Sequence, residues 1–214
     1  MTVRSGGAFG PDRFAEETGV SRETRDRLAI YAALLAKWNP RINLVAASTL
    51  DDVWRRHLLD SAQLHPLLPP GAEVLVDFGS GAGFPGLVLA ILGGPHVHLI
   101  DSDKRKCAFL REVARETGAR ATVHAARIEE VAPFPADVAT ARALAPLDML
   151  VGWAAPFVGR DGQCLFLKGA RLDAELTEAA RNWTMRVDRI ASRTDPSGTI
   201  VRLQDIARVE RDPA

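Results

Sequence analysis

The sequence predicts an α/β fold in which a helical cap precedes a seven-stranded, mostly parallel sheet that ends in an antiparallel hairpin. Two observations predict this architecture. The first 70 residues carry apolar repeats at helical spacing with no strand between them. From Val74 onward, short apolar runs alternate with helical segments, which is typical of a parallel sheet covered on both faces. We therefore assign residues 1–70 to the cap and residues 71–214 to the sheet domain.

Two helices are expected in the cap. Ser21 can cap the first of them, and the Asn39–Pro40 dipeptide should end it. Ser48, with Asp51 three residues later, should open the second helix, and the stretch "HPLLPPG" should stop it. The side chains expected to face the core are Leu28, Tyr31, Leu35 and Trp38 in the first helix, and Val53, Trp54, His57, Leu58, Ser61 and Leu64 in the second.

Five runs in the sheet domain have the composition of strands, in the order "VLVDF", "HVHLI", "ATVHAA", "DVATAR" and "QCLFLK". Helices are expected near residues 85–92, 104–117, 147–158 and 172–182. Two further β-rich runs, "MRVDRIAS" and "TIVRLQ", are separated by "RTDPSG", whose proline and glycine favour a turn. The last two strands should therefore form an antiparallel hairpin.

Charge and cysteine usage narrow the class of protein. The 27 basic and 27 acidic side chains cancel, so a nucleic-acid partner must meet a local basic patch. Cys107 and Cys164 are expected to be unpaired thiols, which favours a reducing compartment, the cytoplasm. No apolar run approaches the roughly 18 residues that a membrane span requires, so no membrane role is expected. We expect a monomer, since no heptad repeat is visible.

The stretch "VDFGSGAGFPG", from Val76 to Gly86, predicts a ligand-binding loop. A phosphate or sugar approaches the main chain closely only where no Cβ intervenes, and a helix that starts there directs free N–H groups at the ligand. Gly79, Gly81, Gly83 and Gly86 meet that need. Three of them also fit the G-x-G-x-x-G fingerprint of dinucleotide sites, so the glycines alone leave the cofactor open.

Two acids and the chain ending bear on that choice. Asp77, at the end of a strand, can accept a hydrogen bond from a cationic amino-acid-like group or order the loop. Asp101, at the end of the next strand, can hold both hydroxyls of a ribose, a contact that either cofactor would use. No second domain remains to hold a hydride acceptor, which disfavours an NAD-dependent oxidoreductase.

Several motifs together resemble one bacterial family. They are "KWNPRINLV", "RRHLLDS", "DFGSGAGFPG", "LIDSDKRKCAFLREVARETG", "RIEE", "ARALAPL" and "LKG". The chain resembles the glucose-inhibited division protein B family, the ribosomal RNA small subunit methyltransferase G enzymes, over residues 20–205. This resemblance implies a Rossmann-like class I methyltransferase fold. It also implies transfer of a methyl group from S-adenosyl-L-methionine to N7 of a guanine in 16S ribosomal RNA, within the small ribosomal subunit.

The resemblance also implies a set of cofactor-binding residues. Gly79 and Phe84 belong to the loop at the methionine side, and Ile128 and Glu129 follow the strand where the family holds the adenine. Arg142 ends a strand that faces both cofactor and substrate. Many relatives carry glutamate at the position of Asp101. The full expected set is Asp77, Gly79, Gly81, Gly83, Phe84, Asp101, Ile128, Glu129 and Arg142.

The chemistry that the resemblance implies needs no catalytic base. Guanine N7 already offers a lone pair and carries no proton, so an in-line displacement requires positioning above all. Arg142 and Lys168 are the positioning candidates, because each ends a predicted strand. His96 and His98 share one face of a strand without a third ligand, so no metal site is expected.

Basic side chains should contact the RNA phosphates and make binding salt-dependent. The candidates are Lys37, Arg41, Arg55, Arg56, Lys104, Arg105, Lys168 and Arg171. One alternative from another class stays open at this point, a non-catalytic RNA-binding or ribosome-assembly factor that keeps the fold.

Overall fold

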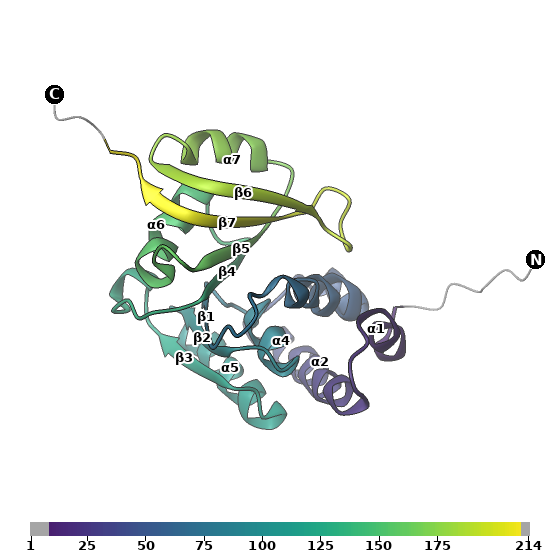
Figure 1. Ribbon diagram of the computed structural model, residues 1–214. Helices are drawn as coiled ribbons and strands as arrows, with labels where there is room; N and C mark the ends of the chain where they lie inside the picture. Colours follow the sequence, from purple (N-terminus) through teal and green to yellow (C-terminus); the bar gives the residue numbers. More distant parts are fainter. Residues whose placement is uncertain (1–8, 211–214) are drawn as a thin grey trace, which may run out of the picture.

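The computed structural model describes residues 9–210, and within them a seven-stranded sheet forms the centre of the molecule (Figure 1). The strands lie in the order β3-β2-β1-β4-β5-β7-β6. Their bounds are β1 Val74–Phe78, β2 His96–Asp101, β3 Ala121–Ala125, β4 Val138–Arg142, β5 Gln163–Lys168, β6 Trp183–Ala191 and β7 Thr199–Arg208. The seven predicted strands are all present, which confirms the predicted fold class.

The first five strands are parallel, and the last two form the predicted hairpin. β1 pairs with β2 on one side and β4 on the other, so the strand order reverses between β1 and β4. β7 inserts antiparallel between β5 and β6. The carboxyl ends of β1 and β4 therefore face the same edge of the sheet, where open α/β sheets bind their ligands.

Helices cover both faces of the sheet. α4 (Gly86–Ile91) and α5 (Lys104–Thr117) lie on one face, together with the cap helices. α6 (Leu147–Val158) and α7 (Leu172–Ala179) lie on the other. Successive strand residues alternate between the two cores, as a pleated strand requires: Leu75 packs with the first group and Val76 with the second.

The cap packs into the first of these cores. α1 (Pro11–Thr18), which the sequence patterns did not predict, buries Phe14 against Trp54. In α2 (Arg22–Ile42), Ser21 caps the first turn as predicted, by accepting from the Thr24 N–H at 3.1 Å. Arg27 of α2 donates to the Thr117 and Ile91 carbonyl oxygens, which end α5 and α4. Helix α2 is thus held to the sheet domain by polar as well as apolar contacts.

The expected end of the first cap helix was wrong. Pro40 lies inside α2, which continues to Ile42 and ends at Asn43 in the left-handed conformation. Asn39 does not terminate the helix. Its side chain exchanges two hydrogen bonds with the backbone of Val45 and holds the following loop. A proline in a last turn is tolerated because a kinked or frayed end loses few hydrogen bonds.

The second cap helix has the predicted apolar face but not the predicted regular form. It consists of the 3₁₀ helix η1 (Ala47–Asp52), the π-helix η2 (Trp54–Leu59), the short helix α3 (Asp60–Ala62) and the 3₁₀ helix η3 (His65–Leu67). Ser48 does not cap it, since η1 has no side-chain cap. The Asp60 N–H donates to the Arg55 carbonyl, five residues back, which widens the turn.

The bounds of the other elements and the state of the cysteines can be compared with the predictions directly. α5, α6 and β5 have the predicted bounds, whereas α7 ends at Ala179, three residues early. Cys107 and Cys164 are buried free thiols, as predicted. Within residues 9–210 we find no helix that is both long and apolar enough to cross a membrane. The same residues contain no group of three or more side chains able to hold a metal ion.

Candidate cofactor and substrate site

Two cavities open at the edge of the sheet where β1, β2, β4 and β5 end. The first has a volume of about 520 Å³, a size typical of small-molecule sites. The predicted cofactor residues that line it are Gly79, Gly81, Asp101, Ile128, Glu129 and Arg142. The structure thus brings together residues from the ends of four strands, β1 to β4, that are far apart in the sequence.

The glycine loop forms one wall of this first cavity. Gly79 and Gly81 both have positive φ, at 59° and 56°, a conformation that side chains other than glycine rarely adopt. A Cβ at Gly79 would lie 2.4 Å from Leu144 Cδ1, whose side chain covers the loop from the β4–α6 connection. A side chain at Gly79 would therefore clash with the residue that covers the loop, whereas a Cβ at Gly81 would meet only the Gly79 carbonyl oxygen, at 3.7 Å.

Asp101 shapes this loop. Its Oδ2 accepts from the Gly81 N–H at 2.8 Å, and its Oδ1 accepts from the Asp103 N–H at 2.8 Å. Each carboxylate oxygen keeps a further lone pair. Asp101 lies on the cavity wall as the ribose prediction requires, and it also anchors the glycine loop to the end of β2.

Asp77 is completely buried beneath the loop and does not line the cavity. Thr140 donates to its Oδ1 at 2.6 Å, whereas its Oδ2 has no hydrogen-bond partner among the described residues. Burial raises the pKa of this carboxyl group to about 6, against the hydrogen bond from Thr140. Asp77 therefore lies behind the loop and supports it.

Ile128 and Glu129 lie on the far wall of the first cavity, in the 3₁₀ helix η4 (Ile128–Glu130). Glu130 points elsewhere: its carboxylate accepts from the Arg127 N–H at 3.2 Å. The two adjacent glutamates thus point in different directions, as expected for neighbouring side chains. Of the two glutamates, the exposed Glu129 is the one that lines the cavity.

Gly83 and Phe84 are buried away from the cavity. The Phe84 ring stacks between Tyr31 and His57, with centroid distances of 5.2 and 5.0 Å. Gly83 is needed for packing, because a Cβ there would lie 2.6 Å from a Leu87 methyl group. Both residues hold the loop against the cap. Phe84 also contacts a residue of the cavity wall, because the Arg142 guanidinium lies over its ring, 4.9 Å from the centroid.

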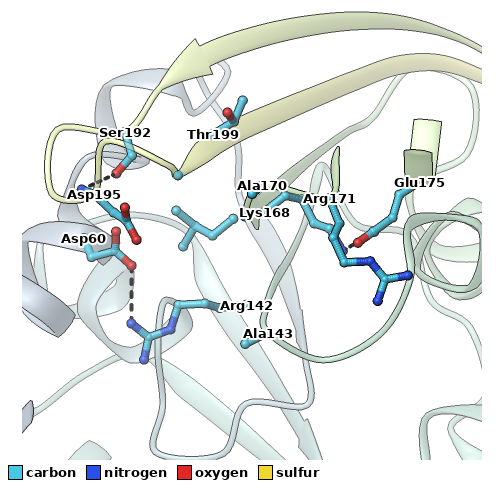
Figure 2. A pocket seen from close by; sticks show the side chains of 13 residues that line it. Asp60, Arg142, Ala143, Lys168, Ala170, Arg171, Glu175, Ser192, Asp195 and Thr199 are labelled. Atoms are coloured by element: carbon cyan, nitrogen blue, oxygen red, sulfur yellow. Dashed lines mark hydrogen bonds and ion pairs between the residues drawn. The ribbon is translucent and has the colours of Figure 1, made fainter. Parts of the chain in front are cut away.

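Arg142 separates the first cavity from a second one and lines both. The second cavity is bounded by Asp60 of the cap, by the end of β5 and by the connection between β6 and β7 (Figure 2). Arg142 donates to Asp60 Oδ2 at 3.3 Å and to the Arg56 carbonyl at 3.4 Å. A predicted positioning residue therefore lies on the wall that the two cavities have in common.

Lys168, the other positioning candidate, lines the second cavity but is engaged within the protein. Its Nζ lies 2.5 Å from Glu175 Oε2 and donates to the Ala145 carbonyl at 2.9 Å. Glu175 also accepts from the Leu147 N–H at 2.9 Å. Lys168 and Glu175 thus tie the β4–α6 connection to α7, and the Lys168 side chain is only 10% exposed.

The remaining predicted RNA contacts are exposed but do not form one cluster. Arg171 lines the second cavity. Arg56 lies in the cap, close enough to Asp195 on the cavity wall for the two charges to interact. Arg105 pairs with Asp103 at 3.1 Å. Lys37, Arg41, Arg55 and Lys104 are exposed on the cap or on α5. Arg171 and Arg56 are therefore the basic residues that the structure brings nearest to the second cavity.

Sequence reasoning missed Leu144 and Trp153 in the first cavity, and Asp60, Asp195 and Thr199 in the second. Leu144 and Asp195 lie in connections between elements, where no periodicity marks them. Asp60 had a signal: it is an acid that follows two core leucines on the apolar face of the second cap helix. A charged side chain on a buried face calls for a partner.

His57 connects the cap to this site as a neutral, buried ring. Its Nε2 is 2.8 Å from Thr49 Oγ1, and its Nδ1 is buried without a hydrogen-bond partner among the described residues. Burial, with Arg142 and Arg56 nearby, lowers the pKa of the ring to about 3. His57 is thus the hydrogen-bonded core residue that its helix face predicted.

This pKa gives a pH dependence of stability with a defined sign. The unfolded chain binds a proton at His57 below about pH 6.5, whereas the folded chain does not until about pH 3. His57 therefore lowers the free energy of unfolding progressively as the pH falls between these values. Urea unfolding measures this effect. Between pH 7.5 and pH 5, the free energy of unfolding should fall less for His57→Gln than for the unmodified chain. An equal loss would mean that His57 is charged in the folded state.

Solved structures of other proteins have the same fold. The chain matches a TehB-like SAM-dependent methyltransferase from Corynebacterium glutamicum with a TM-score of 0.53, at 18% identity, over 69% of this chain and 87% of that one. It matches TYW2 from M. jannaschii in complex with AdoMet with a TM-score of 0.51, at 15% identity, over 70% of this chain and 77% of that one. The fold of this chain is therefore that of the class I S-adenosylmethionine-dependent methyltransferases.

The sequence comparisons identify the family. The model for rRNA small subunit methyltransferase G matches residues 24–195. The chain is 56% identical to the ribosomal RNA small subunit methyltransferase G of Paramagnetospirillum magneticum, over 96% of this chain and 100% of that protein. It is 64% identical to the protein of that name from Rhodospirillum centenum, over 94% and 93%. The chain belongs to the rRNA small subunit methyltransferase G family, which confirms the resemblance found in its motifs.

Proposed function

We propose that this protein transfers a methyl group from S-adenosyl-L-methionine to N7 of one guanine in 16S ribosomal RNA, within the small ribosomal subunit. The family to which the chain belongs carries ribosomal RNA methylation by S-adenosylmethionine. The observation that supports the finer proposal is the pair of adjoining cavities that share Arg142. One cavity suits the cofactor, and the other suits an unstacked base. We place the protein in the cytoplasm, where such an RNA is made.

The first cavity fits the cofactor. Gly79 and Gly81 leave the main chain open where side chains would fill the cavity. The exposed Glu129 and the lone pairs of Asp101 offer acceptors for an adenine and a ribose. When bound there, S-adenosylmethionine supplies an activated methyl group on a cationic sulfur.

The second cavity suits a guanine that has been unstacked from its RNA. A base must leave its stack before an enzyme can reach its ring nitrogen from the side. Arg142, from the shared wall, and Thr199, from β7, offer donors to such a base, and Arg171 offers a charge to its phosphate. The Asp195 carboxylate offers an acceptor.

The residues of this site perform positioning and electrostatic work. Methylation forms an N–C bond at guanine N7 while the donor's S–C bond breaks, so positive charge moves from sulfur to the base. No proton leaves, and no side chain need act as a base. Arg142 and the residues that hold it fix the angle at which the two ligands meet.

The test is methyl transfer from labelled S-adenosylmethionine to small subunits and to naked 16S ribosomal RNA, followed by mapping of the modified base. We expect label at N7 of a single guanine, with subunits as the better substrate. Cofactor binding without label on either RNA would favour the non-catalytic assembly factor. The oxidoreductase alternative is contradicted by the family match, because the relatives are named as methyltransferases.

A further inference from the structure

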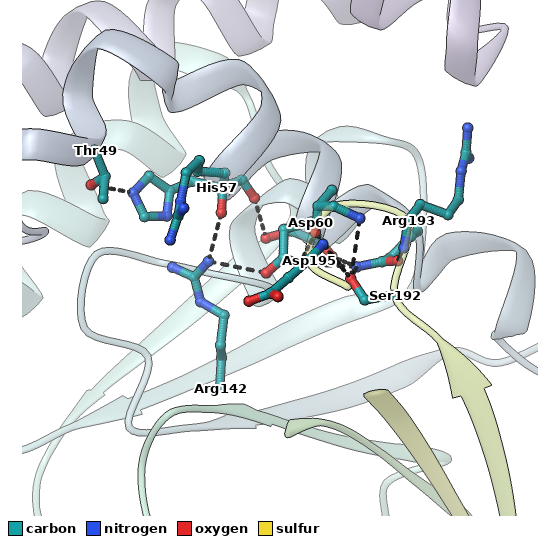
Figure 3. Close-up of polar contacts among 11 residues, drawn as sticks. Thr49, His57, Asp60, Arg142, Ser192, Arg193 and Asp195 are labelled. Carbon is teal, nitrogen blue, oxygen red and sulfur yellow. Dashed lines mark hydrogen bonds and ion pairs between the residues drawn. The ribbon is translucent and has the colours of Figure 1, made fainter. Parts of the chain in front are cut away.

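The carboxylate of Asp60 joins three segments that are distant in the sequence. Its Oδ2 accepts from Arg142 Nη1 at 3.3 Å, at the end of β4. Its Oδ1 accepts from Thr194 Oγ1 at 2.5 Å, in the β6–β7 connection, and from Gln63 Nε2 at 2.9 Å, in the cap. Figure 3 shows Arg142 reaching up from the sheet to meet Asp60 below the cap helix.

The position of Arg142 depends on this contact. Its guanidinium rests on the Phe84 ring and also donates to the Arg56 carbonyl. Neither of these partners carries a charge. Within residues 9–210, Asp60 is the only ion-pair partner of Arg142, and the two side chains are 16% and 19% exposed. A partly buried guanidinium that lost this partner would be uncompensated.

The Asp60 carboxylate also belongs to the hydrogen-bond network that fixes the β6–β7 connection, the far wall of the second cavity. Gln63 accepts from the Arg193 N–H at 2.9 Å and donates to Ser192 Oγ at 3.3 Å. Together with the hydrogen bond from Thr194 to Asp60, these bonds fasten the β6–β7 connection to the cap, beside which it lies in Figure 1. Asp60 therefore acts on two walls of one cavity.

We propose that Asp60 is a positioning residue for the methyl transfer, an inference that rests on the proposed function. It holds the Arg142 guanidinium between the two cavities and offsets its charge. The offset matters because the reaction leaves the methylated base with a positive charge next to Arg142. An ionised Asp60 makes the pair neutral, so the site does not oppose that charge.

Asp60→Asn is the informative variant, because asparagine keeps an oxygen for Thr194 and places an uncharged NH2 group toward Arg142. Both the charge and the hydrogen bond that face Arg142 are then lost. We expect kcat to fall about 100-fold, the order of loss that a small misplacement of a reacting group produces. The dissociation constant for S-adenosylmethionine and the KM for small subunits should change less than threefold. Asp60→Glu should recover part of the lost kcat. Asp173→Asn is the matched control, because Asp173 pairs with Arg189 at 2.5 Å on an exposed surface and should leave kcat unchanged.

A double-mutant cycle tests whether Asp60 acts through Arg142. Asp60→Asn combined with Arg142→Met should be no slower than Arg142→Met alone, within twofold. Losses that multiply, or a single Asp60→Asn variant with unchanged kcat, would overturn the inference. If Asp60→Asn does not fold, Asp60→Ser, which also lacks the carboxylate, takes its place in the cycle with the same two overturning outcomes. An unmodified protein that labels no guanine N7 would reject the proposed function instead, so the two failures differ.

Discussion

Gly79→Val is expected to abolish binding of S-adenosylmethionine while the sheet stays folded. Gly79 has a φ of 59°, which a β-branched residue adopts only at a cost of about 1–3 kcal/mol. Its Cβ would also project toward the cavity, where Leu144 already lies within 2.4 Å. Calorimetry with the cofactor measures the loss of binding, and urea unfolding measures the cost to the fold.

Gly118→Val is the control that separates backbone strain from steric blockage of the cofactor site. Gly118 follows α5 with a φ of 62°, and nothing lies within 4 Å of the position of its Cβ. This variant should lose a similar amount of stability and keep the cofactor affinity of the unmodified chain. Unchanged affinity in Gly79→Val would mean that the glycine loop does not contact the cofactor.

The strands of the sheet could be predicted because their composition is decided by burial. "QCLFLK" lies between two covered faces, so an apolar run without alternation marks β5 from Gln163 to Lys168. α5 was equally well marked: Asp103 accepts from the N–H groups of its first turn, and Gly118 ends it in the left-handed conformation. Local signals and tertiary packing agree in these elements.

The cap could be predicted only in part, because tertiary contacts override its local signals. Asn39 and Pro40 look like a helix end, yet packing of α2 on the sheet domain carries the helix past them to Ile42. The π-helix from Trp54 to Leu59 has no sequence signature of its own. It depends on where His57 and Asp60 must point, which only the folded chain determines.

In the candidate site, too, some residues could be predicted from local sequence signals, whereas others depend on tertiary contacts. Residues at strand ends, such as Gly79, Asp101 and Arg142, were placed correctly on a cavity because topology alone brings strand ends together. Phe84 was not, because its burial depends on rings supplied by the distant cap. Asp60 was missed for the same reason: its partners Arg142 and Thr194 are contributed by segments far along the chain.

Lys168→Ala is expected to destabilise the fold as well as slow the reaction. The change leaves Glu175 with only the Leu147 N–H as a partner, at a site where the two side chains are 10% and 16% exposed. Removing one member of such a pair costs about 3 kcal/mol. It also releases the Ala145 carbonyl, and with it the β4–α6 connection that carries Leu144 over the glycine loop. Urea unfolding and methylation kinetics should both detect the change.

Two further variants decide between this anchoring role and the RNA contact that the sequence predicted for Lys168. A pure phosphate contact would raise the KM for small subunits, weaken its salt dependence and leave the free energy of unfolding unchanged. That pattern is instead expected of Arg171→Ala, because Arg171 is exposed at the same cavity. Lys168→Met combined with Glu175→Gln should recover much of the stability lost in Lys168→Ala, since neither buried charge then lacks its partner. If Lys168→Ala keeps full stability and only the KM for subunits rises, Lys168 is free to meet RNA, and its pairing with Glu175 does not persist in the working enzyme.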